Sequence, residues 1–376
     1  MSKNILIVAG ESSGDIHASN LVKNLKKLDP EIRFFGIGGK NMSREGVEIL
    51  KGIENMAIIG VWEIFSKIPH IREAFAKIRS KISASPPDAA ILVDYPGFNL
   101  RLARALKRKG IPVIYYITPQ VWAWGAFRIR GIKKYVDKAI VILPFEEKLF
   151  RRRGIDATFV GHPILETLRE SAISRSSLGL VEKTPTVAIL PGSREREVRS
   201  MLGLMCEACG ILAGNLSAQF VLLRTSSVDD SLYDEILKGT KLNIKSVKDD
   251  TRGVLGISDF VLTASGTATL EAAVMEKPML IIYKTSFLTA LLFKIFARTP
   301  FIGLVNIIAG RGVCPEVLQY DAGPRHLANE MLGILSSEDK RKRQIEGLRG
   351  VKKLLGPPGA SERAAGIALQ FISRQR

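Results

Sequence analysis

Short, wholly apolar runs recur along this chain and are separated by stretches with helical spacing. Clear examples are Ala89–Val93, Val113–Ile117 and Ala139–Ile142. Runs that are apolar on both faces are typical of buried parallel strands, and parallel strands need crossover connections that are usually helices. Because strand and helix patterns alternate in this way, the sequence predicts α/β domains built on parallel sheets.

The strand–helix pattern starts twice. Asn4–Ala9 predicts a strand that is followed by a glycine loop and a helix, and Thr186–Leu190 begins the same order again. The polar stretch Glu170–Thr184 is the best candidate for an inter-domain linker, and Gly356–Gly359 interrupts the last helical region. We therefore expect three parts. Their boundaries are residues 1–172, 183–355 and 356–376.

The chain carries a large excess of positive charge. It has 55 Lys and Arg against 37 Asp and Glu, so its net charge is +18. Such an excess favours an anionic partner, which can be nucleic acid, an anionic membrane or a phosphorylated ligand. Aromatic residues make up 7% of the chain, and its basic residues are spread among apolar partners. A nucleic-acid binder predicts clustered basic and stacking residues, so it is kept as an alternative and no nucleic-acid partner is expected.

The cysteine count and the apolar segments indicate the cellular compartment of the protein and whether it spans a membrane. Three cysteines cannot form a disulfide framework, which favours a reducing compartment. The first eleven residues reach Glu11 without a signal-peptide core and predict a strand instead. The most apolar stretch, Met279–Gly310, is interrupted by charged residues, so we expect no transmembrane span.

The first glycine loop, Gly10–Asp15, allows two interpretations. It fits the G-x-S-x-G nucleophile elbow of serine hydrolases in a strand–turn–helix context, with His162 or His326 as a partner. However, it follows the first strand, so no earlier strand is available to supply the second oxyanion donor. The alternative is a helix start whose backbone N–H groups bind a sugar or phosphate.

The second loop contains Asp94, which follows the apolar run Ala89–Val93. Ligands of open α/β sheets bind beyond the carboxyl ends of the strands. A half-desolvated carboxylate at that edge suits a general base, whose pKa must be raised. The alternative is that Asp94 only caps the following helix.

Two loops of the second half indicate a diphosphate site. Gly192 lets the backbone approach a ligand closely, and Arg194 stands at a helix start, where its guanidinium suits phosphate oxygens. Ser265 or Thr267 is expected to cap the next helix, whose free N–H groups favour a phosphate. Glu271 lies one turn further on, where it can accept from ribose hydroxyls or complete a capping box.

Metal-binding and P-loop patterns are missing from the sequence. Gly36–Lys40 lacks the spacing and the Ser or Thr of a P-loop, and no D-x-D pair occurs. Cys206 and Cys209 form a lone C-x-x-C in a helical pattern, which is more typical of a core than of a zinc site. We therefore expect neither a metal nor a cofactor.

Short motifs in a fixed order cover nearly the whole chain. They are Val8–Asp15, Gly36–Gly39, Ile59–Glu63, Thr118–Trp124, Leu143–Glu146, Phe159–Pro163, Leu190–Arg194, Ser265–Glu271, Asn306 and Ala309–Arg311. Each motif alone is weak, but together they resemble the lipid-A-disaccharide synthase family. The resemblance implies a GT-B fold, in which two Rossmann-like domains face each other across a cleft and a C-terminal helix crosses back to the first domain.

The resemblance also implies a reaction. A glycosyltransferase of this family is expected to move 2,3-diacylglucosamine from UDP to the 6-hydroxyl of 2,3-diacylglucosamine 1-phosphate. Inversion at the anomeric carbon gives the β-1,6-linked disaccharide 1-phosphate and UDP. By matching position, Asp94 is the expected catalytic base. The expected UDP-sugar-binding residues are Glu11, Ser12, Gly14, Ser193, Arg194, Ser265, Gly266, Thr267, Glu271 and Asn306.

Two positions depart from the family pattern. Family members often have Asp where Gly97 stands, so Asp94 is the one carboxylate of its loop. They often have Arg where Gly125 follows Trp124, and that Arg is a candidate ligand of the acceptor phosphate. Arg128 or Arg130 is the expected substitute.

The acylated substrates imply contact with a membrane. Two stretches combine apolar and basic residues, Val61–Lys81 and Phe287–Arg298, and the alternative for both is a core or dimer-contact helix. The expected acceptor- and membrane-contacting residues are Trp62, Phe65, Ile68, Ile71, Arg72 and Phe75. The implied location is cytoplasmic, peripheral on the inner face of the bacterial inner membrane, and a homodimer is compatible with the sequence. The nearest alternative function is another UDP-sugar-dependent GT-B glycosyltransferase.

Overall fold

The computed structural model describes residues 3–53, 63–122, 127–166, 171–284, 299–318 and 323–374. Residue contacts divide the chain into two compact units. Unit 1 contains residues 1–166 and 355–376, and unit 2 contains residues 167–354. Trp62, the side chain of Phe65 and the stretch Phe287–Arg298 lie outside what the structure describes.

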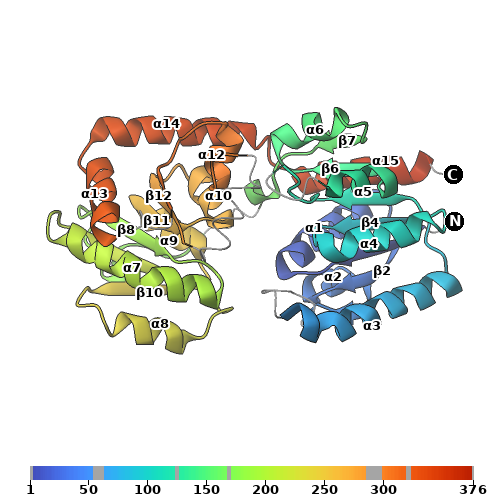
Figure 1. Ribbon diagram of the computed structural model, residues 1–376, viewed down its shortest axis with the longest axis horizontal. Helices are drawn as coiled ribbons and strands as arrows, with labels where there is room; N and C mark the ends of the chain where they lie inside the picture. Colours follow the sequence, from blue (N-terminus) through green and yellow to red (C-terminus); the bar gives the residue numbers. More distant parts are fainter. Residues whose placement is uncertain are drawn as a thin grey trace. The chain divides into compact units, whose positions relative to one another are not determined.

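Unit 1 is built on a seven-stranded parallel sheet (Figure 1). Its strand order is β3-β2-β1-β4-β5-β6-β7. The strands are β1 (Asn4–Ala9), β2 (Arg33–Gly38), β3 (Glu48–Gly52), β4 (Ala89–Val93), β5 (Val113–Tyr116), β6 (Lys138–Val141) and β7 (Ala157–Phe159). The order reverses direction between β1 and β4, which is the switch point where Rossmann-like sheets bind ligands.

Apolar residues pack on both faces of this sheet. Leu6 and Val8 of β1 belong to one core cluster, and Ile5 and Ile7 belong to the other. Alternate side chains of a strand point to opposite faces, so a strand that is covered on both sides must be apolar throughout. The covering helices are α1 (Ser12–Leu28), α2 (Lys40–Arg44), α3 (Glu63–Ala84), α4 (Pro96–Lys107), α5 (Arg128–Tyr135), α6 (Pro144–Arg151) and α15 (Ala360–Arg374).

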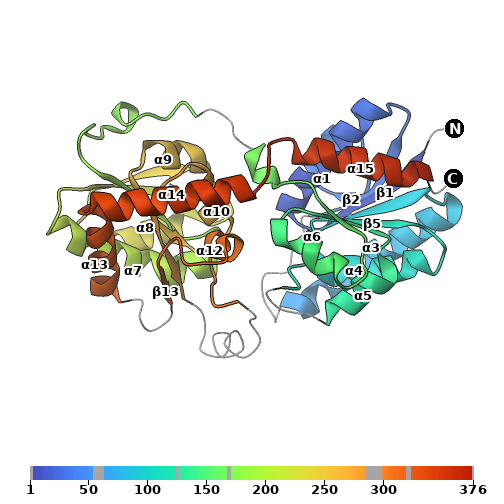
Figure 2. The same cartoon turned by 90° about the horizontal axis from the view of Figure 1, so that it is seen from above.

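The C-terminal helix α15 packs against α1 in unit 1 (Figure 2). The close approach depends on small buried side chains, which include Ala360, Ala364 and Ala368. Two hydrogen bonds of 2.6 Å, from the backbone N–H and the hydroxyl of Ser361 to the carboxylate of Glu166, fix the start of the helix. The expected return of the C-terminal helix to the first domain is therefore confirmed.

Unit 2 repeats the architecture with a six-stranded parallel sheet of order β10-β9-β8-β11-β12-β13. Its strands are β8 (Thr186–Leu190), β9 (Gln219–Arg224), β10 (Ile244–Lys248), β11 (Phe260–Ala264), β12 (Met279–Tyr283) and β13 (Glu316–Leu318). Its helices are α7 (Glu195–Ala213), α8 (Asp230–Leu237), α9 (Thr251–Ile257), α10 (Thr267–Val274), α12 (Leu304–Ala309), α13 (Pro324–Leu335) and α14 (Glu338–Leu354).

The predicted fold class is confirmed, because both units are parallel-sheet Rossmann-like domains. Cys206 and Cys209 lie in the core of unit 2, as their helical pattern indicates. Within the described ranges, no group of three or more His, Cys, Asp or Glu could hold a metal ion. Of the helices in the described ranges, none has the length and apolar character to cross a bilayer.

Candidate active site

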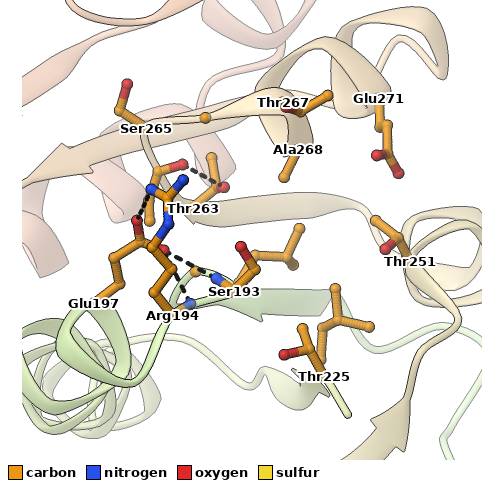
Figure 3. Close-up of a pocket in the computed structure, with 15 residues that line it drawn as sticks. Ser193, Arg194, Glu197, Thr225, Thr251, Thr263, Ser265, Thr267, Ala268 and Glu271 are labelled. Atoms are coloured by element: carbon orange, nitrogen blue, oxygen red, sulfur yellow. Dashed lines mark hydrogen bonds and ion pairs between the residues drawn. The ribbon is translucent and has the colours of Figure 1, made fainter. Parts of the chain in front are cut away.

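A cavity of about 340 Å³ opens at the carboxyl ends of the unit 2 strands (Figure 3). The last residues of β8 and β11, Leu190 and Ala264, line it, as do the loops that follow them. The strand order reverses direction between β8 and β11, so the cavity occupies the switch point of this sheet. Six of the expected UDP-sugar-binding residues line it, namely Ser193, Arg194, Ser265, Gly266, Thr267 and Glu271.

The loop between β8 and α7 is held in shape by Glu197. One oxygen of its carboxylate accepts the backbone N–H groups of Ser193 at 3.0 Å and Arg194 at 3.3 Å. The other oxygen lies 3.1 Å from Nη1 of Arg194. Gly192 has a φ of +115°, and a Cβ there would lie 2.3 Å from the Glu197 carboxylate. The loop therefore requires glycine at position 192. Glycine there is also expected from the sequence, because it lets the backbone approach a ligand closely.

The guanidinium of Arg194 is available to a ligand. Its side chain is 61% exposed. Arg194 is the N-cap residue of α7, and from this position it lines the cavity. An ion pair this exposed contributes little to stability, so its formation does not commit the guanidinium to Glu197.

The start of α10 differs from its predicted form. Its N-cap is Gly266, which has no side chain, and neither Ser265 nor Thr267 caps the helix. The Ser265 hydroxyl donates to the carbonyl of Ile302 at 3.2 Å, and the Thr269 hydroxyl donates to the carbonyl of Gly266 at 2.7 Å. The prediction of a Ser or Thr cap is therefore wrong. The Thr269 N–H donates to the carbonyl of Gly266 at 3.1 Å, and no side-chain cap among the described residues competes with an anion for the N–H groups of Thr267 and Ala268.

Glu271 stands one turn into α10 and contributes a carboxyl group to the cavity. Burial raises its pKa, and the positive charge of Arg252 acts in the opposite direction. No capping-box bond from Glu271 to the start of α10 forms, which leaves its oxygens available to hydroxyl donors.

Asn306 was expected in this pocket, but its side chain is buried and forms hydrogen bonds with nearby residues of the chain. It is 1% exposed and does not line the cavity. Its amide donates to the carbonyl of Cys314 and to Glu316, both at 2.7 Å, and its oxygen accepts the N–H groups of Val313 and Cys314. These bonds use the donors and the acceptor of the amide, so the side chain of Asn306 shapes the turn before β13.

Sequence reasoning missed several residues of the cavity. Thr225 follows β9, Thr251 begins α9 after β10, and Glu197 lies within α7. The rule that residues just after strands form ligand sites would have found the two threonines. Glu197 stands three residues after the N-cap Arg194, which is the capping-box spacing.

Asp94 directly follows β4 in unit 1 and lies in an unusual turn. Asp94 and Tyr95 both have φ of +47°, in the left-handed region that non-glycine residues seldom adopt. Burial and, to a smaller extent, the negative charge of Glu11 raise the pKa of Asp94 to about 6. The N-cap of α4 is Tyr95, so Asp94 does not act as the cap, which was the alternative interpretation.

The loop after β1 lies beside this turn. A Cβ on Gly10 would come within 2.1 Å of the Tyr95 ring, so the two loops touch through a glycine. Glu11 is the N-cap of α1, Ser12 is exposed in the first turn, and Gly14 is buried. Asp15 accepts N–H groups from Gly39, Asn41 and Met42, which joins this loop to the one after β2.

The described structure shows no contact that supports the serine-hydrolase interpretation of Gly10–Asp15. Ser12 makes no hydrogen bond with a histidine of the described residues. Nδ1 of His162 accepts the N–H of Ile164 at 3.1 Å, and His326 belongs to unit 2. Among the described residues of unit 1, the loop therefore shows no hydrogen-bonded pair of nucleophile and base, which this chemistry requires.

Two of the residues expected at a membrane surface pack inward. Ile71 and Phe75 of α3 are partly buried against the unit 1 core, and the Phe75 ring lies 4.3 Å from that of Phe98. Their assignment as lipid-contacting residues is corrected, because the apolar face of α3 covers the sheet. Ile68 is half-buried, and Arg72 is exposed.

Two parallel-sheet Rossmann-like units give this chain the GT-B fold, which it shares with solved structures of a glycosyltransferase and of a UDP-GlcNAc 2-epimerase. The model of the family described as "Lipid-A-disaccharide synthetase" matches residues 5–371. The chain belongs to this family, and it is a glycosyltransferase of lipid A disaccharide synthesis.

The chain is similar to one group of proteins in sequence and to another group in fold alone. The lipid-A-disaccharide synthase of Syntrophus aciditrophicus is 43% identical over 99% of both chains. The calicheamicin glycosyltransferase CalG4 aligns with a TM-score of 0.64 at 13% identity, over 99% of each chain. The UDP-GlcNAc 2-epimerase of Neisseria meningitidis, solved with UDP-GlcNAc bound, gives 0.66 at 13% identity, over 98% of this chain and 100% of its own. At such low identity the two solved structures establish the fold alone.

Proposed function

We propose that this enzyme transfers 2,3-diacylglucosamine from UDP to the 6-hydroxyl of 2,3-diacylglucosamine 1-phosphate. The products are the β-1,6-linked disaccharide 1-phosphate and UDP, and the anomeric carbon is inverted. Family membership supports the class of product, and the residues of the two units support the following roles.

Asp94 acts as the general base in this proposal. The observation that carries it is the desolvated position of this carboxyl group in the turn directly after β4, where burial raises its pKa to about 6. A base with a pKa near the working pH is mostly ionised and still accepts a proton in the transition state. Asp94 would take the proton of the acceptor hydroxyl as that oxygen attacks the anomeric carbon.

The unit 2 cavity would hold the UDP group. Arg194 and the N–H groups at the start of α10, which no side chain caps in the described structure, suit a diphosphate, whose negative charge grows as the bond to the sugar breaks. Glu271 supplies a half-buried carboxyl that can accept from the ribose hydroxyls. Ser193 and Thr267 offer further hydroxyl groups at the cavity wall.

For the acceptor phosphate, Arg128 is favoured over Arg130. Burial raises the pKa of Tyr115 well above its usual value, and the nearby positive charge of Arg128 acts in the opposite direction. The Tyr115 hydroxyl donates to the carbonyl of Asp94. Arg128 is therefore the arginine near the proposed base. Arg130 is exposed on α5.

Acyl chains keep both substrates at a bilayer, so we infer that the enzyme works at the inner face of the inner membrane. Exposed basic residues of unit 1, which include Arg72 and Arg130, supply charges that attract anionic lipids. Flotation with anionic vesicles at low and high salt tests this. Binding that weakens with salt is expected, and no binding at either salt would refute it.

One assay tests the reaction. The purified enzyme is incubated with UDP-2,3-diacylglucosamine and the acceptor, and disaccharide 1-phosphate and UDP are measured by mass spectrometry. NMR of the product determines the configuration of the new bond. A parallel incubation with UDP-N-acetylglucosamine tests for a different UDP-sugar glycosyltransferase, and turnover of that donor alone would contradict the proposed substrate.

A further inference from the structure

The backbone of Asp94 is held in place by buried hydrogen bonds. Asp94 and Tyr95 are two consecutive non-glycine residues with φ of +47°. Such conformations persist when surrounding structure enforces them, and they are frequent at functional sites. The contacts around the turn show which side chains enforce this one.

Two side-chain donors meet on the carbonyl oxygen of Asp94. The Tyr115 hydroxyl donates to it at 2.7 Å, and Nδ2 of Asn99 donates to it at 2.7 Å. Nδ2 of Asn99 also donates to the carbonyl of Val93 at 3.1 Å. Both side chains are fully buried, so water does not compete for these bonds.

The two donors come from different elements. Tyr115 belongs to β5, which pairs with β4, and Asn99 belongs to the first turn of α4. On the other side of the turn, the Tyr95 ring fills the space that Gly10 leaves open. The turn is thus fixed by the neighbouring strand, the following helix and the loop after β1.

The side-chain amide of Asn99 is only partly satisfied, because its nitrogen donates two hydrogen bonds while its oxygen accepts none in the described structure. Oδ1 of Asn99 is buried and has no hydrogen-bond partner in the described structure. A buried acceptor without a partner is unfavourable, and each such group in a folded protein calls for an explanation. Here the explanation is that Nδ2 of Asn99 bonds the carbonyls on both sides of the β4 end.

We propose that Tyr115 and Asn99 are positioning residues, which fix the carbonyl of Asp94 and thereby aim its carboxylate at the acceptor hydroxyl. This inference rests on the proposed role of Asp94 as the base. Neither residue touches the substrate in this proposal. They act through the backbone of Asp94.

The neighbouring tyrosine supplies a matched control. Tyr116 follows Tyr115 on β5, is equally buried, and belongs to the core cluster on the opposite face of the sheet. Tyr115→Phe and Tyr116→Phe each remove one buried hydroxyl from the same strand. The first substitution alone removes a donor from Asp94.

The test compares Tyr115→Phe, Tyr116→Phe and Asp94→Asn in the disaccharide assay. We expect Tyr115→Phe to lower kcat by about 10- to 100-fold, because small displacements of a catalytic group have effects of that size. KM for the donor and UDP affinity by calorimetry should stay unchanged, since Tyr115 lies outside the unit 2 cavity. Tyr116→Phe should keep the wild-type kcat.

A second variant protects the test against a folding defect. Asn99→Ala removes the other donor, and the double variant with Tyr115→Phe should lose less than the product of the two single effects, because both act on one oxygen. Wild-type kcat in Tyr115→Phe and Asn99→Ala, with Asp94→Asn inactive, would overturn the positioning role and leave the base intact. Full activity of Asp94→Asn would instead refute the proposed function.

Discussion

The carboxylate of Glu197 lies 3.1 Å from the guanidinium of Arg194 and also accepts the backbone N–H of that residue. One acidic side chain thus fixes both the loop after β8 and the arginine that it presents to the cavity. A guanidinium held at a helix start beside backbone N–H groups is an arrangement that binds diphosphates.

The first prediction concerns Arg194→Ala, which should weaken UDP binding by about 10- to 100-fold. The reason is the loss of charge-assisted hydrogen bonds, each worth about 1.5–3 kcal/mol. Calorimetry with UDP measures the change. Arg199→Ala is the control, because Arg199 is a similarly exposed arginine of α7 that pairs with Glu195 and does not line the cavity. Equal UDP affinity in the two variants would contradict the assignment.

The second prediction concerns the pH dependence of turnover. Asp94 must be ionised to accept a proton, so kcat/KM should fall as the pH drops below about 6. Asp94→Asn should lower kcat by about 10²–10⁴-fold and retain UDP binding.

Glu11 offers a finer test of the same carboxyl group. Its negative charge raises the pKa of Asp94, so Glu11→Gln should move the acid limb of the kcat/KM profile to lower pH. Glu362→Gln removes an exposed charge from α15 in the same unit and should leave the limb in place. An acid limb that does not move in Glu11→Gln would show that this charge does not reach the base.

The sequence predicted the fold well because its signals were local. Ala89–Val93 and Val113–Tyr116 are apolar throughout, and both form the expected central strands. Gly192 and Arg194 likewise stand at the expected loop and helix start. These features depend on short segments whose composition leaves few alternatives.

Side-chain contacts between residues far apart in the chain could not be predicted from the sequence. The amide of Asn306 is used by residues up to ten positions away, and the apolar face of α3 could equally have met lipid or a sheet. The donors on the carbonyl of Asp94 include Tyr115, 21 positions away, and no spacing rule links the two. Such contacts follow from the tertiary packing of separate elements.

The third prediction concerns Glu146, a fully buried carboxyl group of α6. It accepts Nε1–H of Trp122 at 3.0 Å and the N–H of Leu143 at 3.2 Å, yet burial raises its pKa to about 8. Its pKa in the folded state exceeds the unfolded value, so the folded state prefers the protonated form. Its favourable contribution is complete below about pH 4.5 and is lost as the pH rises to about 8.

Glu146→Gln removes that titration. The free energy of unfolding of the variant, relative to the wild type, should therefore rise between pH 5 and pH 8.5, by a few kcal/mol at most. Urea unfolding at several pH values measures it, and Trp122 fluorescence reports on the local contact. A difference that does not vary with pH would contradict the raised pKa of Glu146.

The fourth prediction concerns the buried histidine His162. Burial lowers its pKa to about 4, and the nearby His17 acts in the same direction. The unfolded state therefore binds a proton more readily than the folded state, and His162 destabilises the fold as the pH falls from about 6.5 to about 4. At the low end the loss is on the order of 3 kcal/mol.

His162→Asn separates this titration from the other ionisable groups. Nδ1 of His162 accepts the N–H of Ile164 at the start of a short 3₁₀ helix, and the side-chain oxygen of Asn can accept the same bond. Compared with the wild type, the variant should gain stability in urea unfolding as the pH is lowered from 7 to 4.5. His326→Asn, at an exposed position of α13, serves as the control and should follow the wild type. If both variants follow the wild type at every pH, protonation of His162 is not coupled to unfolding.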